Sequence, residues 1–498
     1  MVAFVAVGVF LYLGAVAAPP YADDFQFVYG DSPHPVWHWA THRNPYNAVA
    51  YRPIEAVIYA SLQKAFGALN PVPAHVLNMT VHVALAWMIL LLVTGLGFPP
   101  AHALIAGLFA LVSQAQVSAV AGLDTLSQVL AAAFATLSVY LAWRALWQGS
   151  LAAGAWRSRP DRRALACSAV AFALALFSKE TSLGASISLA VVAILWSRRV
   201  HPGRWSAVKA GWLLAAHVAC VALVLIARSQ VGARPPRFGD GRYDLQIGTN
   251  IVENILAAMA GLTIPVSSVQ VYVAALARDL PTLLLAASAG GATIAVVAWG
   301  VWRSVPWQRQ AAAVLLVMSA AALMPVLLMR LSELYLYNAM PFVSAIVGIG
   351  AGTLLQHRRR SARLVAALAI VVVLTIHGAA TRQKVALMRS QGERAAELLS
   401  QISAEARDVP AGGRLVLADS ASEEPEYSVF LMPGFEPVRY GTRFVNKMSA
   451  RSDIAVSLAP RPSDQAVPAQ DITVLTVDRA GHIRVLGRIT SNDLPHTR

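Results

Sequence analysis

The residues whose types could do chemistry begin with two adjacent carboxylates, Asp23 and Asp24, which follow the first apolar segment of the chain. Charged side chains at the edge of apolar segments are costly to keep there and are therefore functional candidates. Two carboxylates in one site, held in different environments, can serve as a general base and its orienting partner. The alternative is that the pair lies in a solvated loop or caps the next helix.

Three further polar clusters stand at the ends of apolar segments. Asp124 begins one segment, where it is either a helix N-cap or a site residue. Lys179 and Glu180 occupy a short turn, where they either neutralise each other or leave Lys179 to bind a phosphate. The last cluster is charged and aromatic and consists of Arg330, Glu333, Tyr335 and Tyr337. Its tyrosines are either interfacial aromatics or site residues.

A polar stripe lies inside one apolar segment, where His75, Asn78 and His82 are spaced three and four residues apart. This spacing places the three side chains on one face of a helix. Such a stripe either lines a wet cavity or forms hydrogen bonds to neighbouring helices.

The apolar segments themselves indicate the class of protein. Of the 498 residues, 57% are hydrophobic and only 13% are charged, and the mean hydropathy is +0.55. Soluble domains carry about twice that share of charge, so the composition indicates a polytopic α-helical membrane protein. The first span is either retained or removed as a signal peptide. We expect about eleven spans, at residues 2–18, 72–96, 101–119, 124–145, 164–178, 182–197, 206–228, 281–302, 308–329, 338–355 and 362–379.

The distribution of charge predicts the orientation of these spans. With the N-terminus in the cytoplasm, the cytoplasmic loops carry fifteen Lys or Arg residues and a single acid, Asp161, as the positive-inside rule requires. The net charge of +14 then follows from topology and does not indicate nucleic-acid binding. Nearly all the polar clusters fall on the extracytoplasmic face. The first outer loop, 19–71, also holds Arg52, and its prolines predict short helices along the membrane surface.

The sequence predicts two domains, a membrane domain at 1–379 and a soluble extracytoplasmic domain at 380–498. The second contains fifteen basic and fourteen acidic residues and no apolar run long enough to span. We expect a small α/β or α+β fold there, with a hairpin formed by its last two strands. Its predicted elements are a helix at 382–406 and strands at 414–419, 428–432, 437–440, 472–477 and 482–488. Both cysteines lie in predicted spans, so no disulfide is expected.

The motifs resemble those of the GT-C superfamily of integral-membrane glycosyltransferases. The nearest likeness is to its polyprenyl-phosphate-sugar-dependent group, which includes protein O-mannosyltransferases, lipid A aminoarabinose transferases and TPR-bearing O-mannosyltransferases. The matching stretches fall in order between residues 20 and 355: Ala-Asp-Asp-Phe at 22–25, Tyr-Arg-Pro-Ile at 51–54, Asn-Pro at 70–71 with the polar stripe, Phe-Ser-Lys-Glu-Thr at 177–181 and Glu-Leu-Tyr-Leu-Tyr at 333–337. The chain departs from the pattern at Leu334, where the family has arginine, and in having no TPR array.

The resemblance implies inverting transfer of one sugar from a polyprenyl-phosphate carrier to an acceptor on the extracytoplasmic face of a bacterial inner membrane. It implies Asp24 or Asp23 as the base that deprotonates the acceptor. The donor phosphate and carrier would be held by Lys179, Arg52, Arg330 and Glu180. The remaining candidates would line the cavity or flank the substrates, and are Asp124, His75, Asn78, His82, Glu333, Tyr335 and Tyr337.

The expected partners are the polyprenyl-phosphate-linked sugar, an acceptor and membrane lipids, without nucleic acid. No cofactor is expected, and a metal is not favoured, although carboxylates such as Asp23, Asp24 and Asp124 could supply oxygen ligands. Two other functions stay open. One is a lipid-linked glycan ligase or phosphotransferase, which needs a similar base and cation. The other is a transporter or flippase of lipid-linked sugars, which would carry charged residues along a path through the membrane rather than at its outer face.

Overall fold

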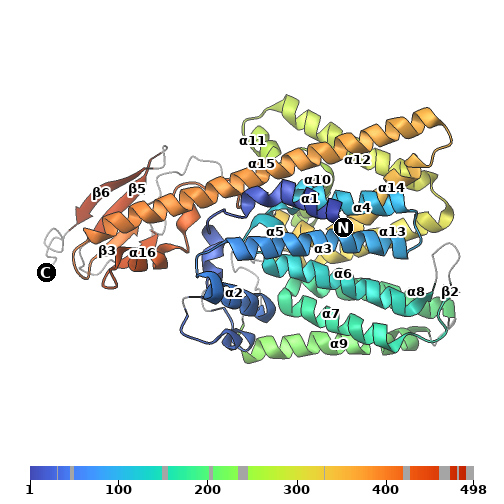
Figure 1. Ribbon diagram of the computed structural model, residues 1–498, viewed down its shortest axis with the longest axis horizontal. Coiled ribbons are helices and arrows are strands. Elements are labelled where there is room, and N and C mark those ends of the chain that lie inside the picture. The colour runs from blue at the N-terminus through green and yellow to red at the C-terminus, as the bar shows by residue number, and fades with distance from the viewer. Residues whose placement is uncertain are drawn as a thin grey trace.

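The computed structural model describes residues 1–30, 32–44, 50–148, 155–200, 206–233, 245–329, 331–418, 427–458, 472–478 and 482–489. A bundle of helices fills one end of the molecule, a small sheet lies at the other, and the long helix α15 (Arg360–Arg407) joins them (Figure 1). We call the end of the bundle that faces the sheet the sheet side, and the opposite end the far side.

Each segment expected to span a membrane forms helix. The helices are α1 (Val2–Tyr12), α3 (Val72–Gly95), α4 (Pro100–Val112), α5 (Val117–Ala121), α6 (Leu126–Leu146), α7 (Arg162–Ser178), α8 (Gly184–Val200), α9 (Ser206–Gln230), α12 (Leu280–Arg303), α13 (Pro306–Leu327), α14 (Met340–Leu355) and α15. A helix satisfies its own backbone polar groups, as lipid requires. Within the described ranges, seven helices are long and apolar enough to cross a membrane, or eight if one bent pair counts as a span. The expected number of about eleven spans is therefore not confirmed.

Three helical features differ from the expectations. The span expected at 101–119 is broken, because α4 ends at Val112 and the following η4 (Gln114–Gln116) and α5 are bent from it by 50°. The helices expected at 362–379 and 382–406 form one continuous helix, α15, since no proline interrupts this stretch. Helices α10 (Thr249–Thr263) and α11 (Ser268–Leu276) were not predicted. The division into two domains at residue 379 falls within α15 and stays a prediction.

Small residues let the helices of the bundle pack closely. Gly300 of α12 faces the backbone of Gly350 in α14, where an added Cβ would collide with the Gly350 carbonyl. Gly348 of the same helix packs against the backbone of His102 in α4. Close backbone approach of this kind replaces the hydrophobic driving force that water supplies to soluble bundles.

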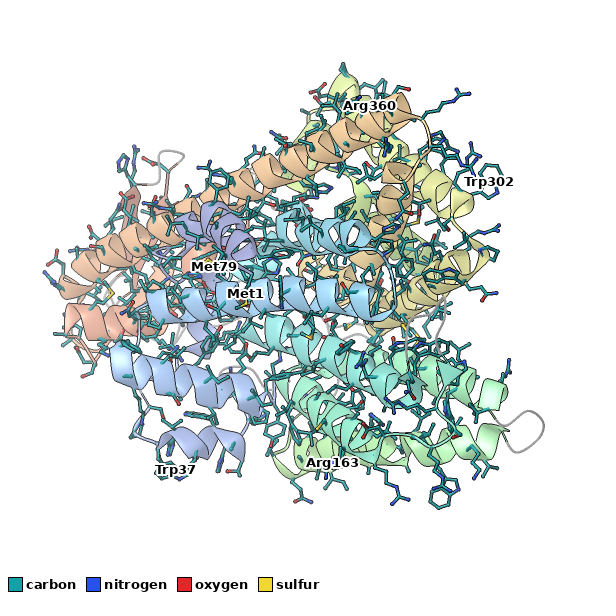
Figure 2. The ribbon with its side chains drawn as sticks, turned by 45° about the vertical axis from the view of Figure 1, so that its right-hand side comes forward. Met1, Trp37, Met79, Arg163, Trp302 and Arg360 are labelled. Atoms are coloured by element: carbon teal, nitrogen blue, oxygen red, sulfur yellow. The ribbon has the colours of Figure 1, made fainter. Side chains whose placement is uncertain are left out.

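The first outer loop forms short helices, as expected. They are η2 (Ala22–Phe27), η3 (Val36–Ala40) and α2 (Pro53–Phe66). Trp37 of η3 lies at the opposite end of the bundle from Trp302 and Arg360, which mark the far side (Figure 2). The loop therefore lies at the sheet side, next to the C-terminal part of the chain.

The C-terminal part contains a mixed four-stranded sheet in the order β4-β3-β5-β6. Strand β3 (Arg414–Leu417) pairs in parallel with β4 (Ala455–Leu458) and β5 (Ile472–Val477), and β5 forms the expected antiparallel pair with β6 (Ile483–Ile489). The end of α15 and helix α16 (Thr442–Ser449) accompany the sheet.

Two of the expected strands in this part are wrong. Residues 437–440 begin in the short helix η8 (Glu436–Val438), because Pro437 lacks the N–H that a sheet ladder needs. Residues 428–432 form only a turn, with an isolated bridge between Tyr427 and Leu431. Strand β4 was not predicted.

Candidate active site

Asp24 is a buried carboxylate held by main-chain donors. It lies in the first turn of η2, and its side chain is about 6% exposed. One oxygen, Oδ2, accepts a hydrogen bond from the Tyr21 N–H at 3.0 Å, and the other, Oδ1, accepts from Leu123 and Asp124 at 3.0 and 2.9 Å. The side chain borders a small cavity of about 20 Å³ together with Phe27 and Tyr59. Asp24 thus ties the first outer loop to the turn that precedes α6.

The three carboxylates near this turn have different environments. Burial raises the pKa of Asp24 well above its usual range, the nearby Asp124 raises it further, and hydrogen bonds from Tyr21 and Asp124 oppose the shift. Asp23 is only partly buried and accepts a hydrogen bond from Gln26 at 3.1 Å. Asp124 is also partly buried, and the N-cap of α6 is Thr125 rather than Asp124. The expected contrast between neighbouring carboxylates is therefore present.

Lys179 is a buried cation that contacts no carboxylate of the described residues. It follows the last residue of α7 in an extended conformation and is about 3% exposed. Its ammonium lies 5.2 Å from the centre of the Tyr335 ring, and within the described part of the chain it donates no hydrogen bond. Burial, followed by the charge of Arg52, lowers the pKa of Lys179 to about 8, while Glu180, Glu55 and Asp124 act in the opposite direction.

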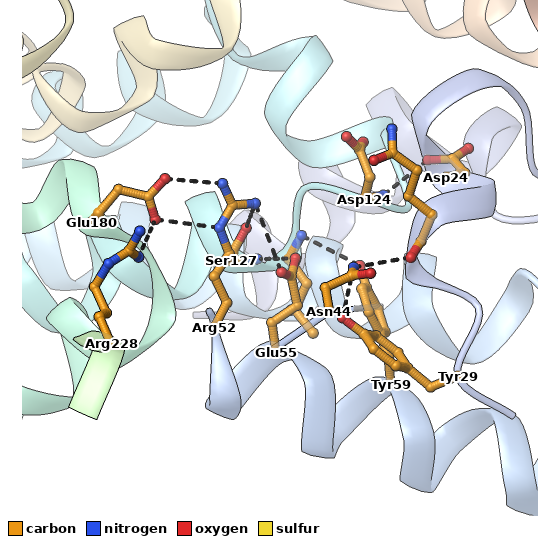
Figure 3. Close-up of polar contacts among 12 residues, drawn as sticks. Asp24, Tyr29, Asn44, Arg52, Glu55, Tyr59, Asp124, Ser127, Glu180 and Arg228 are labelled. Carbon is orange, nitrogen blue, oxygen red and sulfur yellow. Dashed lines mark hydrogen bonds and ion pairs between the residues drawn. The ribbon is translucent and has the colours of Figure 1, made fainter. Parts of the chain in front are cut away.

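Glu180 pairs with arginines rather than with Lys179. Two nitrogens of Arg52 lie 3.2 and 3.4 Å from the Glu180 carboxylate, and Arg228 of α9 lies 3.8 Å from it (Figure 3). Arg52 also donates to Ser127 Oγ at 3.4 Å. The adjacent charges at 179 and 180 therefore do not neutralise each other by direct contact.

Glu55 was not singled out by the sequence, and the structure places it beside this network. Its carboxylate is fully buried, accepts the Ser127 N–H at 2.9 Å and lies 3.9 Å from Arg52 (Figure 3). Burial raises the pKa of Glu55 to about 7 against the opposing charge of Arg52. Its spacing of three residues from Arg52 on a helix that starts with Pro53 was the available sequence signal.

The cluster at 333–338 forms the short helix η7 (Glu333–Asn338) and divides between two neighbourhoods. Tyr335 faces Lys179. Glu333 instead lies 2.5 Å from the ammonium of Lys384 in α15 and accepts a hydrogen bond from Ser268 at 3.1 Å. Lys384 has no local sequence signal, because its partner is 51 residues away. Arg330 lies outside the described residues.

The three polar side chains of the stripe on α3 contact neighbouring segments of the fold. His75 contacts the Ala18 carbonyl at 3.2 Å, Asn78 donates to the Gly122 carbonyl at 2.7 Å, and His82 contacts the Tyr337 hydroxyl at 2.8 Å. All three side chains are buried. This geometry favours the hydrogen-bonding interpretation of the stripe, and cavity lining by these residues and by Tyr337 stays a prediction.

The described residues contain no group of three or more His, Cys, Asp or Glu side chains arranged to hold a metal ion. Asp24 lies near Asp124, and its carboxylate accepts three hydrogen bonds from backbone N–H groups, which favour its charged form. Metal independence of the reaction stays a prediction.

No protein-family model matches the chain, and no curated protein matches its sequence. Among solved structures, ArnT from Cupriavidus metallidurans bound to undecaprenyl phosphate is similar with a TM-score of 0.50 and 12% identity, over 95% of this chain and 92% of that chain. The same protein in the apo state gives a TM-score of 0.49 and 12% identity over 93% and 86% of the two chains.

The oligosaccharyltransferase of Archaeoglobus fulgidus in complex with Zn and sulfate gives a TM-score of 0.49 and 11% identity over 91% of this chain. The chain spans only 61% of the length of that protein. ArnT is an aminoarabinose transferase of the GT-C superfamily, and at 12% identity the likeness to it concerns the fold. The chain has the fold of the GT-C membrane glycosyltransferases, as its motifs predicted.

Proposed function

We propose that this protein is a membrane glycosyltransferase that moves one sugar from a polyprenyl-phosphate carrier to an acceptor on the extracytoplasmic face of a bacterial inner membrane. The observation that carries the proposal is the buried ammonium of Lys179, which lies at the sheet side near Asp124 and Glu55 but contacts neither. A buried cation of this kind is unfavourable unless it meets an anion. The ArnT structure with undecaprenyl phosphate supports a lipid-linked phosphate as that anion.

In the proposed reaction, the acceptor oxygen attacks the anomeric carbon of the sugar as the bond from that carbon to the phosphate oxygen breaks. The electron pair of this bond stays on the polyprenyl phosphate, where Lys179 stabilises the added charge. The proton of the acceptor passes to a carboxylate. We assign this role to Asp24, because its raised pKa makes it a stronger base than an ordinary aspartate and its Oδ2 accepts only one hydrogen bond among the described residues. A single displacement inverts the anomeric configuration.

The remaining residues of the proposed site hold its separate segments together. The Arg52 guanidinium, bound to Glu180 and Ser127, joins the first outer loop to the ends of α7 and α6. Tyr335 covers the Lys179 ammonium with its ring. These contacts bring together four separate stretches of the sequence around the turn that contains Lys179.

A transporter or flippase fits the structure less well. The buried acids and cations described above gather at one end of the bundle, whereas the far side holds a cavity of about 610 Å³ with apolar walls. A transport path needs polar groups at the middle of the membrane. A ligase or phosphotransferase has the same demands for a base and a cation, so its distinction from a glycosyltransferase depends on the products.

The test is an assay of the purified protein in nanodiscs with undecaprenyl-phosphate-linked sugars and a mixture of candidate acceptors. We expect acceptor-dependent release of undecaprenyl phosphate, and a product whose anomeric configuration is opposite to that of the donor. Release of a phosphorylated sugar would assign a phosphotransferase instead. Movement of intact donor across a vesicle membrane without release of undecaprenyl phosphate would contradict the proposal.

A further inference from the structure

The C-terminal part of the chain reaches back to the loop that carries the carboxylate pair. Arg443, in the first turn of α16, donates from one guanidinium nitrogen to the carbonyls of Phe25 and Val28 at 2.5 and 3.2 Å. The Phe25 ring packs on Phe444, with ring centres 5.6 Å apart, and both rings are buried. The contact therefore combines two hydrogen bonds from Arg443 with the packing of two buried aromatic rings.

These two carbonyls lie at the C-terminal end of η2. A helix leaves its last carbonyls without partners from within the helix, so another donor must satisfy them. Helix η2 has only six residues and is a 3-10 helix, whose own hydrogen bonds are weaker than those of an α-helix. The conformation of Asp23 and Asp24 consequently depends on contacts made from outside the helix.

The two ends of η2 are held by different parts of the molecule. At its start, the Asp24 carboxylate binds the backbone of Tyr21 and of the turn before α6. At its end, Arg443 binds the backbone. The Tyr21 hydroxyl adds a second link, because it donates to the Val429 carbonyl at 3.1 Å.

The C-terminal residues that make these contacts are themselves fixed to the rest of the fold. Arg394 of α15 donates to the carbonyls of Met432 and Gly434 at 3.2 and 3.4 Å. The Phe430 ring covers the ammonium of Lys384, 4.6 Å from its centre. The segment that leads to α16 is therefore tied to α15 by hydrogen bonds and a ring contact.

We propose that Arg443 is a positioning residue for the carboxylate pair, so that the C-terminal part of the chain completes the active site. Its guanidinium holds the end of η2 and thereby sets the direction of the Asp24 carboxylate. Arg443 itself touches neither substrate nor the reacting atoms. The expected effect of Arg443 on turnover rests on the proposed function. Its expected effect on the structure of the loop does not.

The test compares Arg443→Met, which removes the donors, with Arg439→Met as a matched control in the full-length protein in nanodiscs. Arg439 is exposed, and its guanidinium lies 3.5 Å from the carboxylate of Glu436 on the same segment. A displacement of about 1 Å at a reacting group costs on the order of a hundredfold in rate. We expect Arg443→Met to lower kcat between about tenfold and a hundredfold without a change in the donor KM, because Lys179 lies on a different element. Arg443→Lys keeps a donor and should recover part of kcat.

A second measurement does not depend on activity. Hydrogen exchange of the backbone amides of residues 22–28 should be faster in Arg443→Met than in the wild type or in Arg439→Met. Equal exchange in all three proteins, or equal kcat in Arg443→Met and Arg439→Met, would overturn the inference. If the wild type lacks transferase activity altogether, the proposed function fails, and the exchange comparison still decides whether Arg443 orders the loop.

Discussion

The two ends of the bundle are built from the same helices but are opposite in character. The sheet side buries charged groups that are held by hydrogen bonds and ion pairs, with Asp24, Glu55 and Lys179 among them. The far side contains a cavity of about 610 Å³ lined by aliphatic side chains and by four indole rings: Trp143, Trp147, Trp156 and Trp307. Two of the rings, Trp147 of β1 (Trp147–Gln148) and Trp156 of β2 (Ala155–Trp156), lie 4.8 Å apart across the pair of short strands.

The difference shows where this fold can do ionic chemistry. A charge removed from water interacts strongly with its neighbours, so a few buried groups create a strong field at the sheet side. The apolar far side offers no comparable field and suits hydrocarbon. The proposed chemistry therefore depends on a few residues at the ends of α6, α7 and η2, and the following predictions test that proposal.

Asp24→Asn should have the largest effect. The amide cannot accept the acceptor's proton, so we expect kcat to fall by about a thousandfold, within the range of general-base catalysis. Asp23→Asn is the matched control, because it changes the neighbouring carboxylate of the same helix, and we expect a smaller loss from it. Steady-state release of undecaprenyl phosphate measures both, and a thermal unfolding scan shows whether each variant is folded. If Asp23→Asn loses as much activity as Asp24→Asn while both are folded, the assignment of the base is wrong.

Lys179→Ala should weaken the binding of undecaprenyl phosphate by about a hundredfold, since it removes the buried cation that meets the phosphate. Arg309→Ala provides the contrast between the two ends, because Arg309 is an exposed cation at the far side. We expect the Arg309 variant to bind like the wild type. Equal affinity of all three proteins would remove Lys179 from the site.

The donor KM should also depend on pH through Lys179. The pKa of this ammonium is lowered to about 8, so the charged form predominates below pH 8 and is lost above it. Donor binding should therefore weaken as the pH rises past about 8. Lys179→Arg keeps its charge at these pH values and should flatten the dependence. A wild-type KM that is constant from pH 7 to about 9.5 would contradict the role of Lys179.

Asp124→Asn should shift the pH profile with a smaller change in the maximal rate. The charge of Asp124 raises the pKa of Asp24, so removing it lets Asp24 lose its proton at lower pH. The base must be deprotonated to act, and the acidic limb of kcat/KM should move to lower pH in the variant. An acidic limb at the same pH as in the wild type would separate Asp124 from the base.

The smallest effect is expected at the far side. Ala311→Phe introduces a large side chain into the apolar cavity, and we expect kcat to stay within about twofold of the wild type, because surface or lining changes distant from the reacting groups are usually mild. The melting temperature is the more sensitive readout for this variant. A large loss of turnover without loss of folding would show that the two ends act together.

More of the fold than of the candidate site could be predicted from the sequence. Apolar runs predicted the helices because a segment in lipid has few alternatives to helix. The carboxylate pair, Lys179 and Arg52 were singled out as candidates because their charges stand out from apolar surroundings. Their partners were not found, since two backbone donors to Asp24, those of Leu123 and Asp124, are about a hundred residues away and their N–H groups carry no residue-specific signal. Lys384 was placed in a soluble helix because its burial arises only when α15 packs against η7 and α11.

The C-terminal sheet was the least predictable region. Four-residue strands such as β4 contain too few alternating positions to identify a strand, and its partner β3 lies about forty residues earlier in the chain. The pairing joins strands that are far apart in the sequence, which no local pattern encodes.

Because α15 is continuous, a small rotation at one of its ends produces a large displacement at the other. Its 48 residues form a rod about 72 Å long, which carries the C-terminal sheet at one end and lies in the bundle at the other. A tilt of about 5° around its first turn would move its last turn by about 6 Å, several times the tolerance of a hydrogen bond. Tilting is one way in which an apolar helix adjusts to the thickness of the bilayer, within the limits that packing against neighbouring helices sets. We therefore expect the contact between Arg443 and the loop to respond to membrane thickness, with turnover passing through a maximum in a series of bilayers of increasing acyl length.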